Sequence, residues 1–369
     1  CTSVAAMSSP VSANAAASAA AEATRALIAQ VGDCLTEFLS VQRAHMEAIG
    51  DDVLPLHDAV VDLTRGGKRL RPSFAYWGYI AGGGDDGAAI VRACTALELL
   101  QACALIHDDV MDGSDTRRGL PSVHRRFAAM HRSNMWHGDS ATFGDGAAIL
   151  VGDVCLSWAD ELLMGSGFEV PALVRAKTIY DIMRTELMAG QYLDLLEQAR
   201  GGGSVERAQH VIRYKSAKYT IERPLLMGAA LADADTAIQH ALSEYGLALG
   251  EAFQLRDDVL GVFGDPEQTG KPAGDDIREG KRTVLIELAM QACDASGRSL
   301  LNQHLGDPAL SPAAVAEVRA LLVDCGALAD VEQRITDATQ AAEAALSHIP
   351  EPAKSALHAL AVAATARHA

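Results

Sequence analysis

The sequence predicts an all-α protein, and both its composition and the positions of its glycine-rich breaks indicate that fold class. Hydrophobic residues make up 49% of the 369 residues but aromatic residues only 5%, so Ala, Leu and Val supply most of the apolar content. Ala and Leu favour helices, whereas aromatic residues favour strands. Glycine-rich breaks separate long stretches of helical periodicity, and alternating runs bounded by hairpin signals are not evident.

The helical pattern runs from about residue 23 to the C-terminus. We therefore expect a disordered Ala/Ser-rich tail over residues 1–22 and a single all-α domain over residues 23–369. No basic residue precedes Arg25, so neither a secretory signal nor a transit peptide is expected. A longer loop is expected over residues 130–146. Helices are expected over residues 88–105, 147–164, 170–196, 205–231, 236–262, 283–293 and 313–346.

Charge and cysteine usage narrow the class of protein. A formal net charge of −17 argues against a nucleic-acid partner, which requires a basic surface. The seven cysteines lack CxxC spacing and lie mostly in apolar runs, which suits buried thiols in a reducing cytoplasm. No uninterrupted apolar run approaches the ~18 residues that span a bilayer, so stable membrane insertion is not expected.

The most informative segment is residues 105–112 (LIHDDVMD), in which three carboxylates follow an apolar stretch. In a helix, Asp108 and Asp112 share a face because they are four residues apart. Carboxylates this close repel one another unless a cation lies between them. Mg²⁺ is usually held by one or two carboxylates together with substrate phosphates. With Asp109, this segment predicts a Mg²⁺–diphosphate site that faces an apolar pocket.

A second acidic motif and several cationic elements accompany the first. Residues 253–260 (FQLRDDVL) are again apolar upstream and end in Asp257 and Asp258. Paired glycines allow close backbone approach, and guanidinium groups fit phosphate oxygens. Each element alone also suits a solvated loop, but their ordered combination predicts a diphosphate site. The remaining elements are GGKRLRP (66–72), DTRRG (115–119), GQYLD (190–194), YKSAK (214–218) and a loop that contains Lys271 and Lys281.

These motifs, in this order, closely resemble those of the trans-isoprenyl diphosphate synthases (polyprenyl synthetases), most of all bacterial geranylgeranyl diphosphate synthases, from about residue 54 to 288. The resemblance implies the isoprenoid synthase fold, a multi-helix bundle around a deep central cavity, in a homodimer. It implies condensation of isopentenyl diphosphate with dimethylallyl, geranyl or farnesyl diphosphate in trans. The two acidic motifs would face each other at the cavity mouth and hold three Mg²⁺ ions. The acidic balance and the lack of an apolar anchor suggest a soluble cytoplasmic enzyme.

The resemblance also implies a role for individual residues. The Mg²⁺ ligands would be Asp108, Asp109, Asp112, Asp257 and Asp258. The allylic diphosphate would contact Arg117, Lys215, Lys281, Ser216 (where Thr is usual) and Gln254, with Gln191 and Lys271 as further substrate-binding candidates. Isopentenyl diphosphate would contact Lys68, Arg71, Arg118 and Gln101.

The chain departs from the family pattern at two positions. Gly261 stands where the second motif normally ends in a third Asp, which predicts weaker outer contacts to the metal. Gln101, seven residues before Asp108, stands where many relatives have His, which predicts altered affinity for isopentenyl diphosphate.

Product length is expected to depend on the side chains that the growing tail meets below the first motif. Where the family uses bulky aromatics for short products, this chain has the small residues Cys103 and Ala104, with Leu100 one turn further back. At ~1.5 Å per helical residue, a floor one to two turns lower adds about 5–10 Å. Geranylgeranyl diphosphate is therefore the expected main product, and farnesyl or longer polyprenyl diphosphates are the alternatives.

Three other functions compete with this one. A class I terpene cyclase also uses an aspartate-rich motif, but the basic elements and scarce aromatics argue against it. A His-Asp phosphohydrolase is suggested by His57-Asp58 and His107-Asp108, yet the other histidines form no clear ligand set, and His107 is expected to be structural. A non-catalytic regulatory subunit is disfavoured by the intact first motif.

Overall fold

The structure is a computed structural model that describes residues 10–200, 202–265, 274–307 and 309–365. Helices make up almost all of it, which confirms the predicted all-α class. The helices in the first half are α1 (Pro10–Glu47), η1 (Asp51–Val53), α2 (Leu54–Thr64), α3 (Leu70–Ala81), α4 (Ala88–Met111), α5 (Val123–Ser133), α6 (Ser140–Met164) and α7 (Val170–Arg200). Those in the second half are α8 (Val205–Val211), the π-helix η2 (Ile212–Glu222), α9 (Arg223–Leu231), α10 (Thr236–Phe263), α12 (Asp275–Arg278), α13 (Val284–Ala292), α14 (Ala295–His304), α15 (Pro312–Asp324), α16 (Ala327–Ala345), η3 (Leu346–His348) and α17 (Ala353–Thr365).

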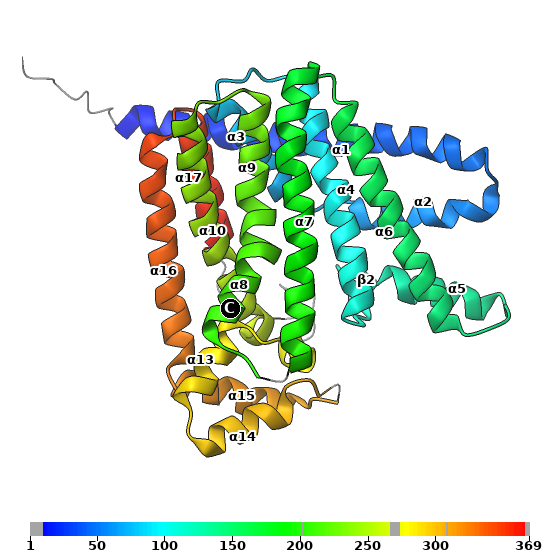
Figure 1. The fold of residues 1–369 in the computed structure, drawn as a ribbon, viewed down its shortest axis with the longest axis vertical. Helices are drawn as coiled ribbons and strands as arrows, with labels where there is room; N and C mark the ends of the chain where they lie inside the picture. The colour runs from blue at the N-terminus through cyan, green and yellow to red at the C-terminus, as the bar shows by residue number, and fades with distance from the viewer. Residues whose placement is uncertain (1–9, 201, 266–273, 308, 366–369) are drawn as a thin grey trace, which may run out of the picture.

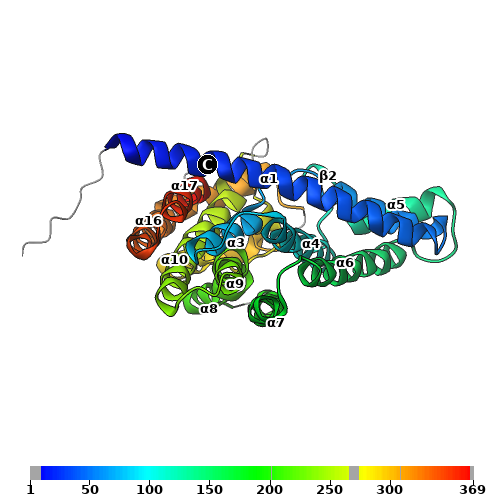
Figure 2. The same cartoon turned by 90° about the horizontal axis from the view of Figure 1, so that it is seen from above.

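Most of the long helices run up and down the bundle, and α1 lies across one end of it (Figure 1). Seen from above, α1 runs along one edge of the bundle (Figure 2). Helix α4 packs against α1, α3 and α6, while α10 packs against η2, α9 and α16. The C-terminal ends of α4 and α10, which carry the two acidic motifs, thereby come to the same region of the molecule.

Helix α4 is largely apolar and has no continuous polar face. Among the described residues it is the one helix long and apolar enough to cross a membrane. However, 72% of its most apolar window is buried inside the protein. Leu97, Leu99 and Leu100 are at most 1% exposed. A helix without a polar face is either a membrane span or a core element. Here it is the central core helix.

A second, smaller hydrophobic cluster lies at the other end of the bundle. It joins the C-terminal half of α10 to α8, η2 and α12 to α16, with Val259, Val284, Val318 and Val331 at most 2% exposed. This cluster fixes the direction of α10 just where its acidic motif occurs.

Helices α3 and α9 approach so closely that their backbones touch. A Cβ atom added at Gly78 would lie 2.1 Å from the carbonyl oxygen of Leu225. One added at Gly228 would lie 1.8 Å from the carbonyl oxygen of Ala75. Glycine at both positions therefore permits the crossing, which brings the N-terminal end of α3 close to η2.

Several elements differ from the sequence-based expectation. Helix α1 begins at Pro10, inside the segment 1–22 expected to be a tail, and Ala20 is 1% exposed because it packs on the core. The expected loop 130–146 is mostly helical, since α6 begins at Ser140, where Asp139 accepts from the backbone N–H groups of residues 141 and 142. The expected helix 313–346 is two helices, separated at Gly326, whose φ of 81° ends the first helix.

Two further local features were not expected. The DTRRG segment forms a two-residue antiparallel hairpin, β1 (Thr116–Arg117) with β2 (Leu120–Pro121). The expected helix 205–231 contains the π-helix η2, which includes the YKSAK motif. Short π segments inside α-helices are frequent at functional sites.

Candidate active site

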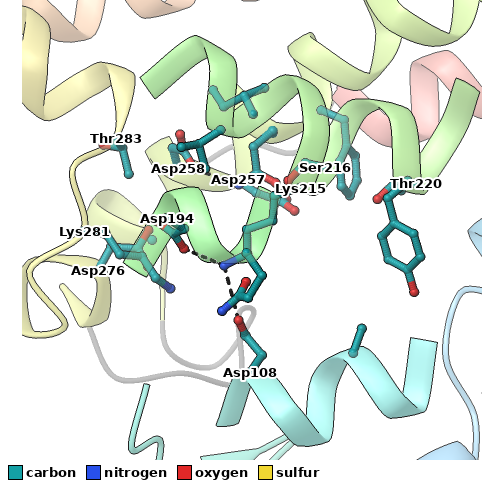
Figure 3. A pocket seen from close by; sticks show the side chains of 18 of the residues that line it. Asp108, Asp194, Lys215, Ser216, Thr220, Asp257, Asp258, Asp276, Lys281 and Thr283 are labelled. Atoms are coloured by element: carbon teal, nitrogen blue, oxygen red, sulfur yellow. Dashed lines mark hydrogen bonds and ion pairs between the residues drawn. The ribbon is translucent and has the colours of Figure 1, made fainter. Parts of the chain in front are cut away.

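A cavity of about 1110 Å³ opens between α3, α4, α7, η2 and α10. Residues of both acidic motifs and most of the predicted cations line it. Figure 3 shows Asp108, Lys215 and Asp257 around a common space. The apolar part of the wall includes Leu105, Leu187, Ile212 and Phe253. The predicted site residues that line the cavity are Lys68, Arg71, Gln101, Ala104, Asp108, Arg117, Gln191, Lys215, Ser216, Gln254, Asp257, Asp258 and Lys281.

Lys215 connects the first acidic motif to α7. Its Nζ lies 2.6 Å from Asp194 Oδ2 and 3.2 Å from Asp108 Oδ1, and Figure 3 shows both contacts as dashed lines. Burial opposes ionisation of Asp108, but Lys215, Lys281 and Arg117 together hold its pKa below the ordinary value. Burial likewise opposes the charge on Lys215, yet Asp108 and Asp194 raise the pKa of its ammonium. Both groups are therefore charged at neutral pH.

Asp109 faces away from the cavity. Its carboxylate is 2% exposed and accepts from Arg117 Nε at 2.9 Å and from the same guanidinium's Nη2. Because burial outweighs the effect of this guanidinium, the pKa of Asp109 is raised. The structure thus gives Asp109 a contact that orients Arg117, whose side chain reaches the cavity.

Asp112 is buried beside the site without lining it. Its Oδ2 lies 3.9 Å from Lys281 Nζ, and its Oδ1 has no hydrogen-bond partner among the described residues. Burial and the neighbouring Asp108 raise the pKa of Asp112 to about 7. A buried carboxylate oxygen without a donor, one helical turn from Asp108, suits an additional cation.

Lys281 lies between the two acidic motifs. Its Nζ is 2.6 Å from Glu279 Oε2 and 3.3 Å from Asp276 Oδ1. Burial would lower the pKa of this lysine, but Asp276, Glu279 and Asp112 raise it well above its ordinary value. Within the described ranges no three His, Cys, Asp or Glu side chains form a ready-made metal site. Lys215 and Lys281 instead contact carboxylates of this region.

The second motif contains one buried carboxylate. Asp258 accepts from Gln254 Nε2 at 2.7 Å, and burial together with Asp276 raises its pKa well above the ordinary value. Gly261, where the family has a third Asp, lies against Asp276: a Cβ there would be 1.9 Å from Asp276 Oδ2. The carboxylate of Asp276 therefore occupies space that a side chain at position 261 would need.

A second group of polar side chains lies on the α3 side of the cavity. Arg71 donates from Nη2 to Thr220 Oγ1 at 2.8 Å, and its guanidinium lies 4.2 Å from the centroid of the Tyr219 ring. The Tyr219 hydroxyl donates to Gln101 Oε1 at 2.9 Å. Since Lys68 lines the cavity beside them, this group offers cations and hydrogen-bond donors separate from those of the acidic motifs.

Five predicted residues among those described do not line the cavity. Arg118 is exposed and donates to the carbonyl oxygen of Leu63 at 2.8 Å. Leu100 is buried in the core, and Cys103 lies 3.7 Å from His107 Nδ1 on the side of α4 that packs on α6. Asp109 contacts Arg117 and Asp112 lies beside Lys281. Lys271 lies outside the described residues.

His107 also points away from the cavity. Its Nε2 lies 3.1 Å from the carbonyl oxygen of Ile149, and a Cβ at Gly152 would lie 2.1 Å from the same nitrogen. Gly152 thus makes room for the imidazole between α4 and α6. This placement agrees with the structural role expected for His107.

Some residues that shape the site were missed in the sequence. Gly190 allows α7 to approach η2, because a Cβ there would lie 2.5 Å from the backbone nitrogen of Lys215. Asp194 and Asp276 contact the two lysines, and Tyr219 and Thr220 position Arg71. The motif GQYLD contains Gly190 and Asp194, and Tyr219 and Thr220 directly follow YKSAK, but sequence alone does not show which residues meet.

Comparison with known proteins places the chain in a family. The sequence profile of the family described as polyprenyl synthetase matches residues 55–322, and the chain belongs to this family of trans-prenyltransferases. It has the all-α isoprenoid synthase fold.

Individual relatives support that assignment. The crystal structure of geranylgeranyl pyrophosphate synthase from Corynebacterium glutamicum, complexed with isoprenyl diphosphate and magnesium, is 42% identical. It covers 93% of this chain and 99% of its own, with a TM-score of 0.90. Geranylgeranyl diphosphate synthase of Mycobacterium tuberculosis is 33% identical over 78% of this chain and 76% of its own. Geranylfarnesyl diphosphate synthase of Aeropyrum pernix is 32% identical over 77% of this chain and 84% of its own.

Proposed function

We propose that this enzyme condenses isopentenyl diphosphate with dimethylallyl, geranyl and farnesyl diphosphates in trans and that its main product is geranylgeranyl diphosphate. The observation that supports this is the presence of two separate anion-binding groups in one cavity. Lys215 and Lys281 lie among the aspartates, whereas Lys68, Arg71 and Gln101 lie on the α3 side. Two diphosphate substrates require two such groups, and the apolar wall suits a prenyl tail.

The chemistry follows from the position of the charges. Lys215, Lys281 and Arg117 neutralise the diphosphate that leaves as its C–O bond breaks, which stabilises charge where it develops. The double bond of isopentenyl diphosphate then attacks the allylic carbon to form the new C–C bond. The departing diphosphate takes the proton that is lost when the alkene re-forms, so no protein base is required.

We propose that Mg²⁺ binds between the two motifs, with three ions per active site. Asp108 and Asp112 from α4 and Asp257 and Asp258 from α10 supply oxygen ligands of the kind that Mg²⁺ prefers. The unpartnered oxygen of Asp112 supports this assignment. Bound Mg²⁺ would polarise the leaving diphosphate. Asp109, which contacts Arg117, is assigned to orienting that cation rather than to the metal.

The proposed function is tested by incubating the purified protein with Mg²⁺, radiolabelled isopentenyl diphosphate and each allylic substrate in turn. Elongated prenyl products, separated by chromatography, are expected. Cyclic hydrocarbon would instead indicate a terpene cyclase, and release of phosphate alone would indicate a hydrolase. Activity only after addition of a second subunit would indicate a regulatory protein.

We propose that Asp276 replaces the missing third aspartate of the second motif. In Gly261→Ala the added methyl pushes the Asp276 carboxylate aside without supplying an oxygen, since it would lie 1.9 Å from Oδ2. The Mg²⁺ concentration for half-maximal activity is expected to rise about tenfold, equivalent to one lost charge-assisted contact. Asp276→Asn should raise this Mg²⁺ concentration to the same extent. Gly261→Asp should largely restore the wild-type Mg²⁺ dependence. If Gly261→Ala leaves the Mg²⁺ dependence unchanged, Asp276 has no such role.

Ala104 is the residue that we propose to limit product length, because it lines the cavity and Cys103 does not. In Ala104→Phe the added ring would fill the space one turn below Asp108, so the main product should shorten to farnesyl diphosphate. Cys103→Phe should instead destabilise the packing between α4 and α6 and leave the product profile of the folded fraction unchanged. Chromatography of the dephosphorylated products measures both; shortening only in Cys103→Phe would contradict this placement.

We propose a soluble cytoplasmic homodimer that forms through α6 and α7. Asp160 joins these helices through contacts of 3.3 Å with Lys177 and Arg184. Both helices expose several large apolar side chains, and exposed apolar side chains gathered on neighbouring helices indicate a protein contact. The exposed side chains are Phe143, Ile149, Leu150, Met164, Val170, Val174, Ile182, Met188 and Tyr192.

Charged substitutions test the dimer surface. Leu150→Glu combined with Ile182→Glu should convert the dimer to a monomer in sedimentation velocity experiments, because each places a carboxylate in the buried contact. Val323→Glu on α15, where the valine is 53% exposed, is the control and should remain dimeric. A dimer that withstands the double substitution would place the contact elsewhere.

A further inference from the structure

The turn between α2 and α3 adopts backbone conformations that require an external restraint. Gly66 and Gly67 have φ of 69° and 98°, and Arg69, the residue before α3, has φ of 49°. Positive φ is unfavourable for a residue with a long side chain. Because Lys68 and Arg71 flank Arg69, whatever holds Arg69 also fixes these two cavity-lining cations.

A buried ion pair supplies the restraint. The Arg69 guanidinium contacts the carboxylate of Glu98 on α4 through Nη1 and donates from Nη2 to the carbonyl oxygen of Thr64 at 2.7 Å. The two side chains are only 6% and 8% exposed. The Arg69 carbonyl oxygen also accepts from the N–H of Ser73 at 3.0 Å and from its Oγ at 2.8 Å. The turn is therefore tied to the core helix on one side and to α3 on the other.

The same stretch of α4 also contacts the side chains around Arg71, through Gln101. Gln101, one helical turn beyond Glu98, accepts from the Tyr219 hydroxyl, and the Tyr219 ring lies against Arg71. The turn that carries Lys68 and the side chain of Arg71 are thus held by two contacts that originate three residues apart on α4. Neither Arg69 nor Glu98 lines the cavity itself.

We infer that Glu98, acting through Arg69, is a positioning residue that sets Lys68 and Arg71 at the spacing that binds the diphosphate of isopentenyl diphosphate. This inference rests on the function proposed above. A buried ion pair does not in general stabilise a fold more than apolar residues would, so stability alone does not account for one at this place. Removing either partner leaves the other charge buried and releases the turn.

The test compares the two substrates in steady-state kinetics. For Glu98→Gln we expect the KM for isopentenyl diphosphate to rise at least tenfold, with kcat within about threefold and the KM for the allylic substrate within about twofold of wild type. Arg69→Met should likewise raise the KM for isopentenyl diphosphate while leaving kcat and the KM for the allylic substrate nearly unchanged. In the double variant the effects should not multiply, because both substitutions break one contact.

Glu332→Gln is the matched control. Glu332, whose side chain is 43% exposed, pairs with the buried Arg256 at 2.6 and 2.7 Å, far along the chain from the α2–α3 turn, so this variant loses a bidentate arginine–glutamate pair elsewhere. It should lower the Tm without changing the ratio of the two KM values. If Glu98→Gln lowers the Tm but leaves that ratio unchanged, or raises both KM values equally, the ion pair is merely structural and the inference is wrong.

The inference can fail separately from the proposed function. Wild-type enzyme that forms no elongated product refutes the proposed function, whereas a normal wild type with an unaltered KM ratio in Glu98→Gln refutes only the positioning role. Should Arg69→Met not fold, Glu98→Asp is the second variant. It keeps the charge but shortens the side chain, and should show a smaller change in the same direction. Calorimetric titration of wild type and Glu98→Gln with isopentenyl diphosphate must show the same loss of affinity.

Discussion

Replacing Asp108 by Asn is expected to lower kcat by about 10²- to 10³-fold while leaving the protein folded. The substitution keeps the size of the side chain but removes the charge that faces Lys215 at 3.2 Å and Arg117 at 3.5 Å. It also removes the carboxylate that, with Asp112, is proposed to hold Mg²⁺. Incorporation of radiolabelled isopentenyl diphosphate measures the rate, and far-ultraviolet circular dichroism measures the fold.

The control for this experiment is Asp115→Asn, just beyond the same motif. Asp115 is 80% exposed at its side chain and pairs with Arg125 outside the cavity, so its activity should stay within about twofold of wild type. Asp257→Asn, on the opposite wall, should resemble Asp108→Asn. Wild-type rates in both motif variants would refute the proposed role of the aspartates.

Replacing Gly228 by Val is expected to produce the largest loss of stability among single substitutions outside the site. The Cβ of the new residue would lie 1.8 Å from the carbonyl oxygen of Ala75 and 2.7 Å from the backbone nitrogen of Tyr79. Both are main-chain atoms of α3, so relief requires the two helices to separate. A loss of about 3 kcal/mol or more in the free energy of unfolding is expected.

Urea denaturation measures this effect where the variant remains soluble, and otherwise the yield of soluble protein does so. Gly32→Val is the matched control, because Gly32 also lies inside a helix but a Cβ there meets nothing within 4 Å. Its effect should be within about 1 kcal/mol of zero, since valine is a slightly better helix former than glycine. Equal stability in the two variants would show that α3 and α9 can separate at little cost.

Sequence reasoning located the site because motifs and helical periodicity are local properties. The position of Asp108 and Lys215 in the cavity follows from motif order, and the structure brings them together. What periodicity could not decide is which of two adjacent side chains faces inward. Successive residues of a helix point about 100° apart. Asp109 therefore turns toward Arg117 while Asp108 faces the cavity.

Other features depended on contacts between distant segments. Asp276 fills the space beside Gly261 although fifteen positions separate them, and no local pattern indicates that neighbour. The same holds for Cys103, whose small size suggested a cavity floor but whose neighbour is His107, on the side of α4 that packs against α6. Side-chain size predicts available volume only when the facing helix is known.

The largely apolar surface of α4 has a consequence for the nascent chain. The 24 residues of this helix are synthesised before α6, the helix against which it packs most extensively in the finished protein. During that interval the apolar side chains of the helix are exposed to solvent, and transiently exposed apolar surfaces promote aggregation. Fragments that end between residues 111 and 140 should accordingly bind chaperones and precipitate without them, whereas the complete chain shields the helix as it folds.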